Sequence, residues 1–288
     1  MDEPLATSAG LARRLALQLC RTDPATGSSC AWLHGFWQCL RILGLAADPA
    51  RHAAFYGDAL GETHAAGGAP RVLVSGAADY SMLAHALAAF RARAVEPAIT
   101  VIDRCETPLH LNRWYADRVG CQLESQRAGM LDYAPPAPFD AICTHSFLGM
   151  FSPLERPRLV DAWHRALRPG GRLVTAHPLR PGGPDEPNRF SAEQARAFRA
   201  AVAERADEIA GLLGSSAAEV MSQAERYLGA SYGYPVRSID ELRALFRDAG
   251  FALEHLELAS PPAGPHAAGG PGLRNAAVRY AHVIAVRR

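Results

Sequence analysis

The chain has 288 residues, of which 49% are hydrophobic and 20% charged, so it can bury a sizeable core and is not a disordered protein. Its formal net charge is +1, from 30 Lys and Arg against 29 Asp and Glu. This balance argues against a basic field that would recruit nucleic acid or an anionic membrane. We therefore expect a small-molecule partner, no nucleic acid and no membrane.

The first four residues lack the basic region and apolar core of a signal peptide, and no run of about 18 apolar residues follows them. We expect a cytoplasmic protein. The six cysteines are scattered, without C-x-x-C pairs or zinc-like spacing, which predicts reduced, mostly buried thiols and no metal site. They are Cys20, Cys30, Cys39, Cys105, Cys121 and Cys143.

Residues 1–66 are predicted to form an N-terminal helical cover, because helical periodicity runs from Leu11 to about Leu60 without strand signals. The segment 30–40 contains two tryptophans, a histidine and a phenylalanine. Two interpretations stay open here. Trp32 and Phe36, four residues apart on a helix, could pack on the sheet. Alternatively, the segment could be a lid that brings His34 or Trp37 over a ligand.

The stretch 71–83 organises the rest of the chain. A short apolar run, Arg71 to Ser75, stops at Gly76 and continues with helical periodicity, which predicts a strand, a tight turn and a helix. Ala77 and Ala78 are small enough for a ligand to approach the backbone. The next predicted strand ends in Asp103, about 20 to 30 residues after the turn, where an acidic side chain can accept hydrogen bonds from ribose hydroxyls. Together these features predict a nucleoside pocket.

From Arg71 onward, strands alternate with helices, which is typical of a parallel sheet covered on both faces. Residues 67–288 are therefore predicted to form one α/β domain, with a helical insertion at about 184–235 that follows a proline- and glycine-rich hinge. Ser191 and Gln194 predict the cap of the insertion's first helix. The strands are predicted at 71–75, 99–103, near 122–127, 139–144, 172–177, 252–259 and 277–286.

This order of segments resembles the class I S-adenosylmethionine-dependent methyltransferases over about residues 71–288. The segment 72–76 looks like the glycine motif of that family, with Val74 in place of its usual acidic residue and Ala78 and Tyr80 in place of later glycines. The segments 101–104 and 130–133 are similar to its second and third motifs, while 139–145 and 167–173 resemble its fourth motif and the entry to strand five.

The resemblance implies a doubly wound, mostly parallel seven-stranded Rossmann-like sheet and S-adenosylmethionine as the cofactor. In the family, the acidic residue of the second motif, here Asp103, holds the ribose diol, and that of the third, here Asp132, accepts from the adenine amino group. The cofactor-binding residues that we predict are Gly76, Ala77, Asp79, Tyr80, Asp103, Arg104, Leu131, Asp132 and His145.

His145 follows an apolar strand at its carboxyl end, where a base could take a proton from a methyl acceptor or where a histidine could simply form a polar wall. It is the candidate catalytic residue. His177 ends the fifth strand in a comparable position. The predicted substrate contacts are His34, Trp37, Tyr232 and Tyr234, and we expect the cover and the insertion to close over the cofactor.

The leading hypothesis is methyl transfer from S-adenosylmethionine to a small molecule. One alternative is attack by the cofactor's own amine on its aminopropyl carbon, which would yield azetidine-2-carboxylate and methylthioadenosine. Another is a non-catalytic module that senses the cofactor. The same scaffold serves nitrogen, oxygen and carbon acceptors, so the sequence leaves the acceptor atom open. It also leaves the oligomeric state open, and a homodimer is possible.

Overall fold

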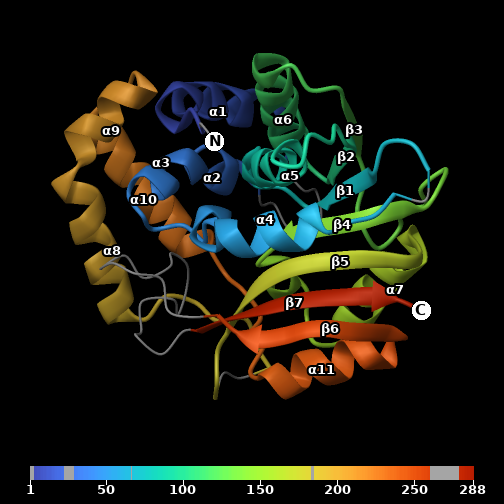
Figure 1. Ribbon diagram of the computed structural model, residues 1–288. Coiled ribbons are helices and arrows are strands. Elements are labelled where there is room, and N and C mark those ends of the chain that lie inside the picture. The colour runs from blue at the N-terminus through green and yellow to red at the C-terminus, as the bar shows by residue number, and fades with distance from the viewer. Residues whose placement is uncertain (1–2, 23–28, 66, 183–184, 260–278) are drawn as a thin grey trace.

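The computed structural model describes residues 3–22, 29–65, 67–182, 185–259 and 279–288. Within them a seven-stranded sheet has the order β3-β2-β1-β4-β5-β7-β6 (Figure 1). Neighbouring strands are parallel except that β7 runs antiparallel to β5 and β6. Strand order reverses between β1 and β4, as in a doubly wound sheet. The strands are β1 (Arg71–Ser75), β2 (Ala98–Asp103), β3 (Leu123–Arg127), β4 (Phe139–His145), β5 (Leu167–Leu179), β6 (Phe251–Leu258) and β7 (Arg279–Arg287).

Both faces of the central strands β1, β2 and β4 are buried, and successive residues of each strand point to opposite sides of the sheet. Val72 and Val74 face one core, which also contains side chains of α4 (Ala53–Gly61), α5 (Ser81–Arg91) and α6 (Glu106–Val119). Leu73 faces a second core, with α7 (Arg156–Ala166) and α11 (Ile239–Asp248). The predicted α/β fold class is thus confirmed.

A third core joins the N-terminal helices to the insertion. Phe36 and Phe198 are both buried in it, and the Trp32 ring lies 5.6 Å from that of Tyr227. The interpretation in which Trp32 and Phe36 pack on the sheet is therefore wrong, since both pack among helices. The helices of this layer are α1 (Leu5–Leu19), α2 (Ala31–His34), α3 (Trp37–Ile42), α8 (Ala192–Glu204), α9 (Ala206–Leu213) and α10 (Ala217–Ala230).

This helical layer stands beside the end of the sheet at which β5 finishes (Figure 1). The insertion starts and ends close together, because Asn188 and Gly233 form an antiparallel bridge. Its first helix has the predicted cap. The Ser191 side chain accepts from the Gln194 N–H, and the Gln194 side chain accepts from the Ser191 N–H. Cover and insertion therefore lie next to the carboxyl ends of the strands, where ligands of such sheets bind.

The boundaries differ from the prediction mainly at β5. The strand begins at Leu167, directly after α7, because Leu167 pairs with Phe139 before the register shifts. Two short 3-10 helices, η1 (Pro49–His52) and η2 (Phe147–Met150), complete the fold. The predicted start of the last strand, at Ala277, and the proline- and glycine-rich loop before it lie outside the described residues. None of the described helices is long and apolar enough to cross a membrane.

Candidate functional site

Asp103 links the β1–α5 turn to the end of β2. The Ala77 N–H donates to Asp103 Oδ2 at 3.0 Å, and the Cys105 N–H donates to Oδ1 at 2.7 Å. Burial raises the pKa of Asp103, although His34 and these two N–H groups counteract the rise. A carboxylate offers about four acceptor positions. Each oxygen therefore keeps room for one more hydrogen bond, as a ribose diol requires.

Gly76 has the conformation that the sequence suggests. Its φ is +73°, and a Cβ added to it would lie 2.3 Å from Cε2 of Phe147. Both the left-handed backbone and the Phe147 ring therefore exclude a larger residue. The turn that opens α5 is built on this glycine.

Two of the predicted cofactor contacts have buried side chains that hold this turn in place. Asp79 Oδ2 accepts from Arg41 Nη1 at 2.9 Å, and its Oδ1 accepts from the Ser81 N–H at 2.9 Å. The Tyr80 ring stacks on Tyr115, with centroids 4.7 Å apart, and has no exposed surface. In this structure both side chains shape the turn and neither reaches an open crevice.

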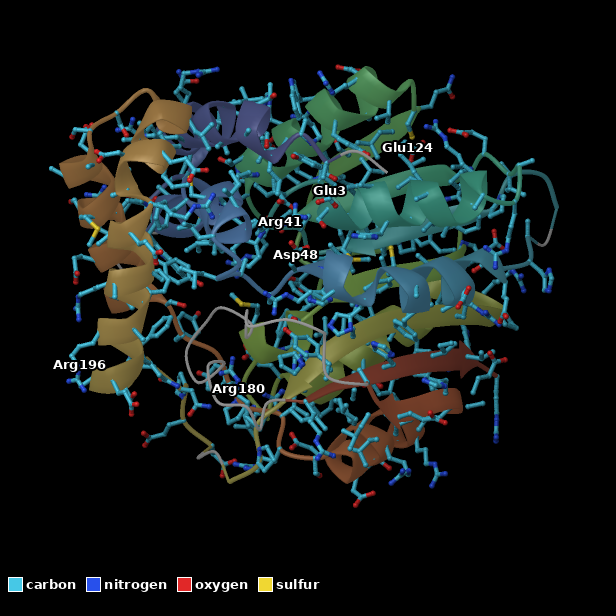
Figure 2. The ribbon with its side chains drawn as sticks, turned by 60° about the vertical axis from the view of Figure 1, so that its left-hand side comes forward. Glu3, Arg41, Asp48, Glu124, Arg180 and Arg196 are labelled. Carbon is cyan, nitrogen blue, oxygen red and sulfur yellow. The ribbon has the colours of Figure 1, made fainter. Side chains whose placement is uncertain are left out.

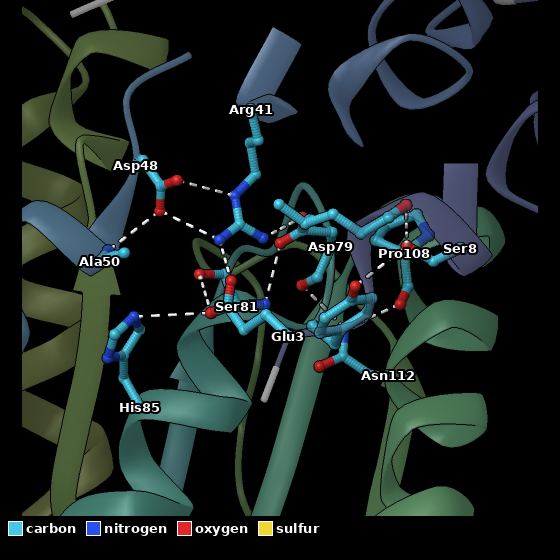
Figure 3. A network of polar contacts seen from close by, with 12 residues as sticks. Glu3, Ser8, Arg41, Asp48, Ala50, Asp79, Ser81, His85, Pro108 and Asn112 are labelled. Carbon is cyan, nitrogen blue, oxygen red and sulfur yellow. Dashed lines mark hydrogen bonds and ion pairs between the residues drawn. The ribbon is translucent and has the colours of Figure 1, made fainter. Parts of the chain in front are cut away.

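Arg41 joins the turn to the N-terminal segment through a buried ion-pair network (Figures 2 and 3). Its guanidinium contacts Asp79, Asp48 at 3.1 Å and Glu3, and only 1% of its side chain is exposed. His85 lies 3.6 Å from Glu3 at the edge of the same network. The network connects α3, the loop before η1 and the start of α5, which fixes the cover against the sheet.

The predicted adenine side of the site lies in the turn after β3. The Asp132 N–H donates to the Gly129 carbonyl at 3.1 Å. In this turn Asp132 is exposed and Leu131 is half-buried. A Cβ added to Gly129 would lie 3.6 Å from Cγ of Arg104. The turn that carries Leu131 and Asp132 therefore begins beside Arg104, which follows Asp103 at the carboxyl end of β2.

The tautomer of His145 follows from the bonds around one hydroxyl. Tyr56 donates its hydroxyl hydrogen to the Thr144 carbonyl at 2.9 Å and accepts from the Ala176 N–H at 3.0 Å. His145 Nδ1 lies 2.9 Å from the same oxygen. The Thr144 carbonyl can only accept, so we assign the single hydroxyl hydrogen to it and assign Nδ1–H of His145 as the donor to the Tyr56 oxygen. Nε2 of His145 is left with a free lone pair, and it is buried without a hydrogen-bond partner among the described residues.

Further unsatisfied polar atoms occur at the end of β5. Within the part of the chain that the structure describes, His177 Nδ1 and Arg180 Nη1 are also buried without a hydrogen-bond partner. Burial lowers the pKa of His145 and of His177 well below 6.5, so both rings are neutral at pH 7. Burial also lowers the pKa of Arg180. Nothing in the sequence around Arg180 indicated this position, because only the packing of distant segments buries the guanidinium.

The predicted substrate contacts are divided between two places. Tyr232 and Tyr234 have ring centroids 6.3 Å apart, and the Tyr234 N–H donates to the Gly149 carbonyl in η2, which follows β4. Trp37 packs against the third core. His34 lies elsewhere, with its Nδ1 3.4 Å from the sulfur of Cys20 at the end of α1. The two tyrosines are thus the members of the set beside the β4 and β5 ends.

A separate cleft of about 670 Å³ lies between α1–α2 and α9–α10, lined among others by Trp32, Leu213 and Gln223. None of the described residues that line it comes from a strand end. The candidate site at Asp103 and His145 is therefore distinct from this cleft.

No protein-family model matches the chain, and no curated protein matches its sequence. Solved structures do match its fold. The Burkholderia thailandensis 1,6-didemethyltoxoflavin-N1-methyltransferase is 19% identical, with a TM-score of 0.50 over 83% of this chain and 81% of that one. A geranyl diphosphate methyltransferase is 14% identical, with a TM-score of 0.51 over 83% and 78%. The (4+2)-cyclase SpnF is 18% identical, with a TM-score of 0.50 over 80% and 79%. The fold is that of the class I S-adenosylmethionine-dependent methyltransferases.

Proposed function

We propose that the protein is an S-adenosylmethionine-dependent methyltransferase that acts on a small molecule. The observation that carries the proposal is Asp103, whose carboxylate is held by the Ala77 and Cys105 N–H groups beside the point where strand order reverses. This is the location at which doubly wound sheets bind a ribose. The two methyltransferase structures of the same fold support the proposal, since one is bound to S-adenosylhomocysteine and the other to sinefungin.

The residues present fit this cofactor. Asp103 retains acceptor capacity for both hydroxyls of a ribose, and Gly76 and Ala77 form the turn beside it. We propose that the adenine lies toward Leu131 and Asp132, in the turn after β3. Bound S-adenosylmethionine supplies an electrophilic methyl group that is transferred by in-line displacement. The task of the protein is then to align the acceptor and exclude water.

His145 is proposed to act as the general base. Its Nδ1–H is fixed by Tyr56, its Nε2 lone pair is free, and burial keeps the ring neutral. A neutral imidazole in this tautomer can accept the proton that an O–H or N–H acceptor loses on methylation. A carbon acid could use the same base, so the acceptor atom is not determined by this geometry.

Arg180 favours an acceptor with an anionic group. Arg180 Nη1 is buried and has no partner in the described ranges, which is costly unless a ligand supplies a hydrogen-bond acceptor. A carboxylate or phosphate on the substrate would supply it, with Tyr232 and Tyr234 available as aromatic contacts nearby. The cytoplasmic location, the possible homodimer and the absence of a nucleic-acid partner stay predictions from the sequence.

Product analysis tests the proposal directly. The full chain is incubated with S-adenosylmethionine carrying a deuterated methyl group, first alone and then with a panel of acidic and neutral small-molecule acceptors, and all products are identified by mass spectrometry. Methyl transfer predicts a stable cofactor until an acceptor is added, followed by S-adenosylhomocysteine and a labelled product. Methylthioadenosine with azetidine-2-carboxylate from the cofactor alone would establish the cyclase instead. Binding without turnover across the panel would favour the sensing module.

A further inference from the structure

Three of the six cysteines and one histidine meet at a single point. Cys20, Cys30, His34 and Cys105 each place one sulfur or nitrogen atom within 4.8 Å of the corresponding atoms of the other three. Cys105 Sγ lies 3.5 Å from the sulfurs of both Cys20 and Cys30. Nδ1 of His34 lies 3.4 Å from Cys20 Sγ. The sequence spacing conceals this cluster, because its members extend from residue 20 to residue 105.

These distances match the edges of a metal-centred tetrahedron. Zinc–sulfur bonds of about 2.3 Å and zinc–nitrogen bonds of about 2.0 to 2.1 Å imply edges of about 3.8 Å between sulfurs and about 3.5 Å between sulfur and nitrogen. The observed separations of 3.4 and 3.5 Å are close to these edges. They are far above the S–S bond length of about 2.05 Å, and all the cysteines of the cluster are free thiols.

Three local features of the chain bring the ligand atoms together. Thr22 and Ser29 pair in an antiparallel bridge, which places Cys20 and Cys30 side by side. Cys30 and His34 are four residues apart across the single turn of α2, so their side chains share a face. Cys105 immediately precedes α6, where the helix N-terminus favours a thiolate.

We propose that Cys20, Cys30, His34 and Cys105 bind one zinc ion. Four protein ligands of this type close the coordination sphere, which is the arrangement of structural zinc sites and not of catalytic ones, where one position stays open. The soft thiolates favour zinc over magnesium, calcium or manganese. The Thr107 hydroxyl, 3.2 Å from Cys20 Sγ, is placed to support a ligating sulfur.

The proposed zinc site would connect the cover to the cofactor side of the sheet. Cys20 follows α1, Cys30 directly precedes α2 and His34 ends it. Cys105 lies two residues after Asp103 and donates its N–H to that carboxylate. The ion would thus fix the loop between β2 and α6, which contains Cys105, against helices α1 and α2. This inference is independent of methyl transfer, since it requires only that the four side chains bind a metal.

Metal analysis of the full-length protein tests it. The chain is purified with reductant and without chelator, and zinc is quantified by mass spectrometry against protein concentration. We expect about one zinc ion per chain. The metal is then replaced by Co²⁺, whose visible spectrum distinguishes tetrahedral from octahedral sites and whose near-ultraviolet charge-transfer band reports thiolate ligands. A tetrahedral, thiolate-rich Co²⁺ spectrum is expected.

Substitutions assign the ligands. His34→Ala and Cys105→Ser should weaken zinc binding by at least about tenfold, as measured in competition with a chromophoric chelator. Substituting a residue that only hydrogen-bonds to a metal ligand already lowers metal affinity by about tenfold or more, and these two variants remove a ligand itself. Cys121→Ser is the matched control, because this cysteine is free and outside the cluster, and it should bind zinc as the wild type does. If the first two variants fold poorly, His34→Cys keeps four ligands. It should retain zinc and strengthen the Co²⁺ charge-transfer band.

Three results would overturn the proposal. The first is a zinc content well below one ion per chain that stays low after the reduced protein is incubated with Zn²⁺. The second is an octahedral Co²⁺ spectrum. The third is an unchanged zinc affinity in both His34→Ala and Cys105→Ser. A disulfide between Cys105 and Cys20 or Cys30, found by peptide mapping together with no metal uptake after reduction, would show that the cluster is a redox pair instead.

Discussion

At the scale of single residues, the tautomer of His145 determines what it can do. Tyr56 holds Nδ1–H, so Nε2 is the atom that can accept a proton. We predict that His145→Gln lowers kcat by about 10²- to 10⁴-fold, the usual contribution of a general base. Because burial keeps the pKa of His145 well below 6.5, wild-type kcat should stay flat between pH 7 and 8. Steady-state kinetics at several pH values measure both effects.

Tyr56→Phe separates this role from simple packing. The variant retains the ring but removes the oxygen that orients Nδ1–H, so it should lower kcat with little change in KM. A His145→Gln enzyme with wild-type kcat would rule out base catalysis and leave the histidine as part of the pocket wall.

Asp103 carries the predicted ribose contact. Asp103→Ala should weaken S-adenosylmethionine binding by about 1.5 to 3 kcal/mol, the range for hydrogen bonds to a charged group. Titration calorimetry on the folded variant measures it. Asp117→Ala, an exposed carboxylate on α6, is the control and should leave the affinity unchanged. Equal affinities for the wild type and Asp103→Ala would place the cofactor elsewhere.

At the scale of elements, Arg41 holds three segments together through Glu3, Asp48 and Asp79. Removing one partner of a buried ion pair leaves uncompensated charge in the interior. Arg41→Met should therefore lower the free energy of unfolding by about 3 to 5 kcal/mol, as measured by urea denaturation. Arg199→Met, which breaks an exposed pair with Glu225, should leave the midpoint near that of the wild type. Similar midpoints for the two variants would contradict the structural role of Arg41.

The third core predicts that cover and insertion unfold together. Phe198 is 1% exposed and stacks on Tyr227, with centroids 5.5 Å apart. Phe198→Ala should remove about 3 to 5 kcal/mol of local stability and speed hydrogen exchange in α1 and α3 as well as in α8 to α10. The amides of β1 and β4 should keep their protection.

Leu17→Ala serves as the control for this experiment. Leu17 lies on α1 but is 74% exposed, so its truncation should leave exchange unchanged. Faster exchange confined to α8–α10 in Phe198→Ala would mean that the two groups of helices open separately.

At the scale of the whole molecule, buried histidines predict how stability depends on pH. Burial lowers the pKa of His52 from 6.5 to about 3 and that of His85 to about 4. Between pH 6.5 and these values, the unfolded chain binds more protons than the folded one, so the free energy of unfolding falls as the pH is lowered. Each buried histidine contributes a slope of up to about 1.4 kcal/mol per pH unit.

Urea denaturation at pH 7, 6 and 5 measures this slope. His85→Leu should flatten it, because the variant removes one protonation site of the unfolded state. His110→Gln removes an exposed histidine on α6 and should leave the slope as it is. An identical pH dependence of the wild type and His85→Leu would contradict the assignment.

Local patterns in the sequence were sufficient for the class of fold. Strands and helices alternate with clear periodicity, Gly76 ends β1, and Asp103 ends β2, so the turn and the carboxylate of the proposed cofactor site were identified from short segments. These features are local because backbone sterics and side-chain alternation act over a few residues. The sequence by itself also suggested the cap at Ser191 and the position of His145 at a strand end.

The tertiary structure decided which side chains meet. Tyr56 binds His145 across 89 residues, Arg41 binds Asp79 across 38, and Cys20 lies beside Cys105 across 85. Such contacts leave no periodic signal, because each partner sits in its own helix or turn with ordinary local spacing. For the same reason, the burial of Arg180 and the packing of the N-terminal helices on the insertion emerge only when the distant segments are folded together.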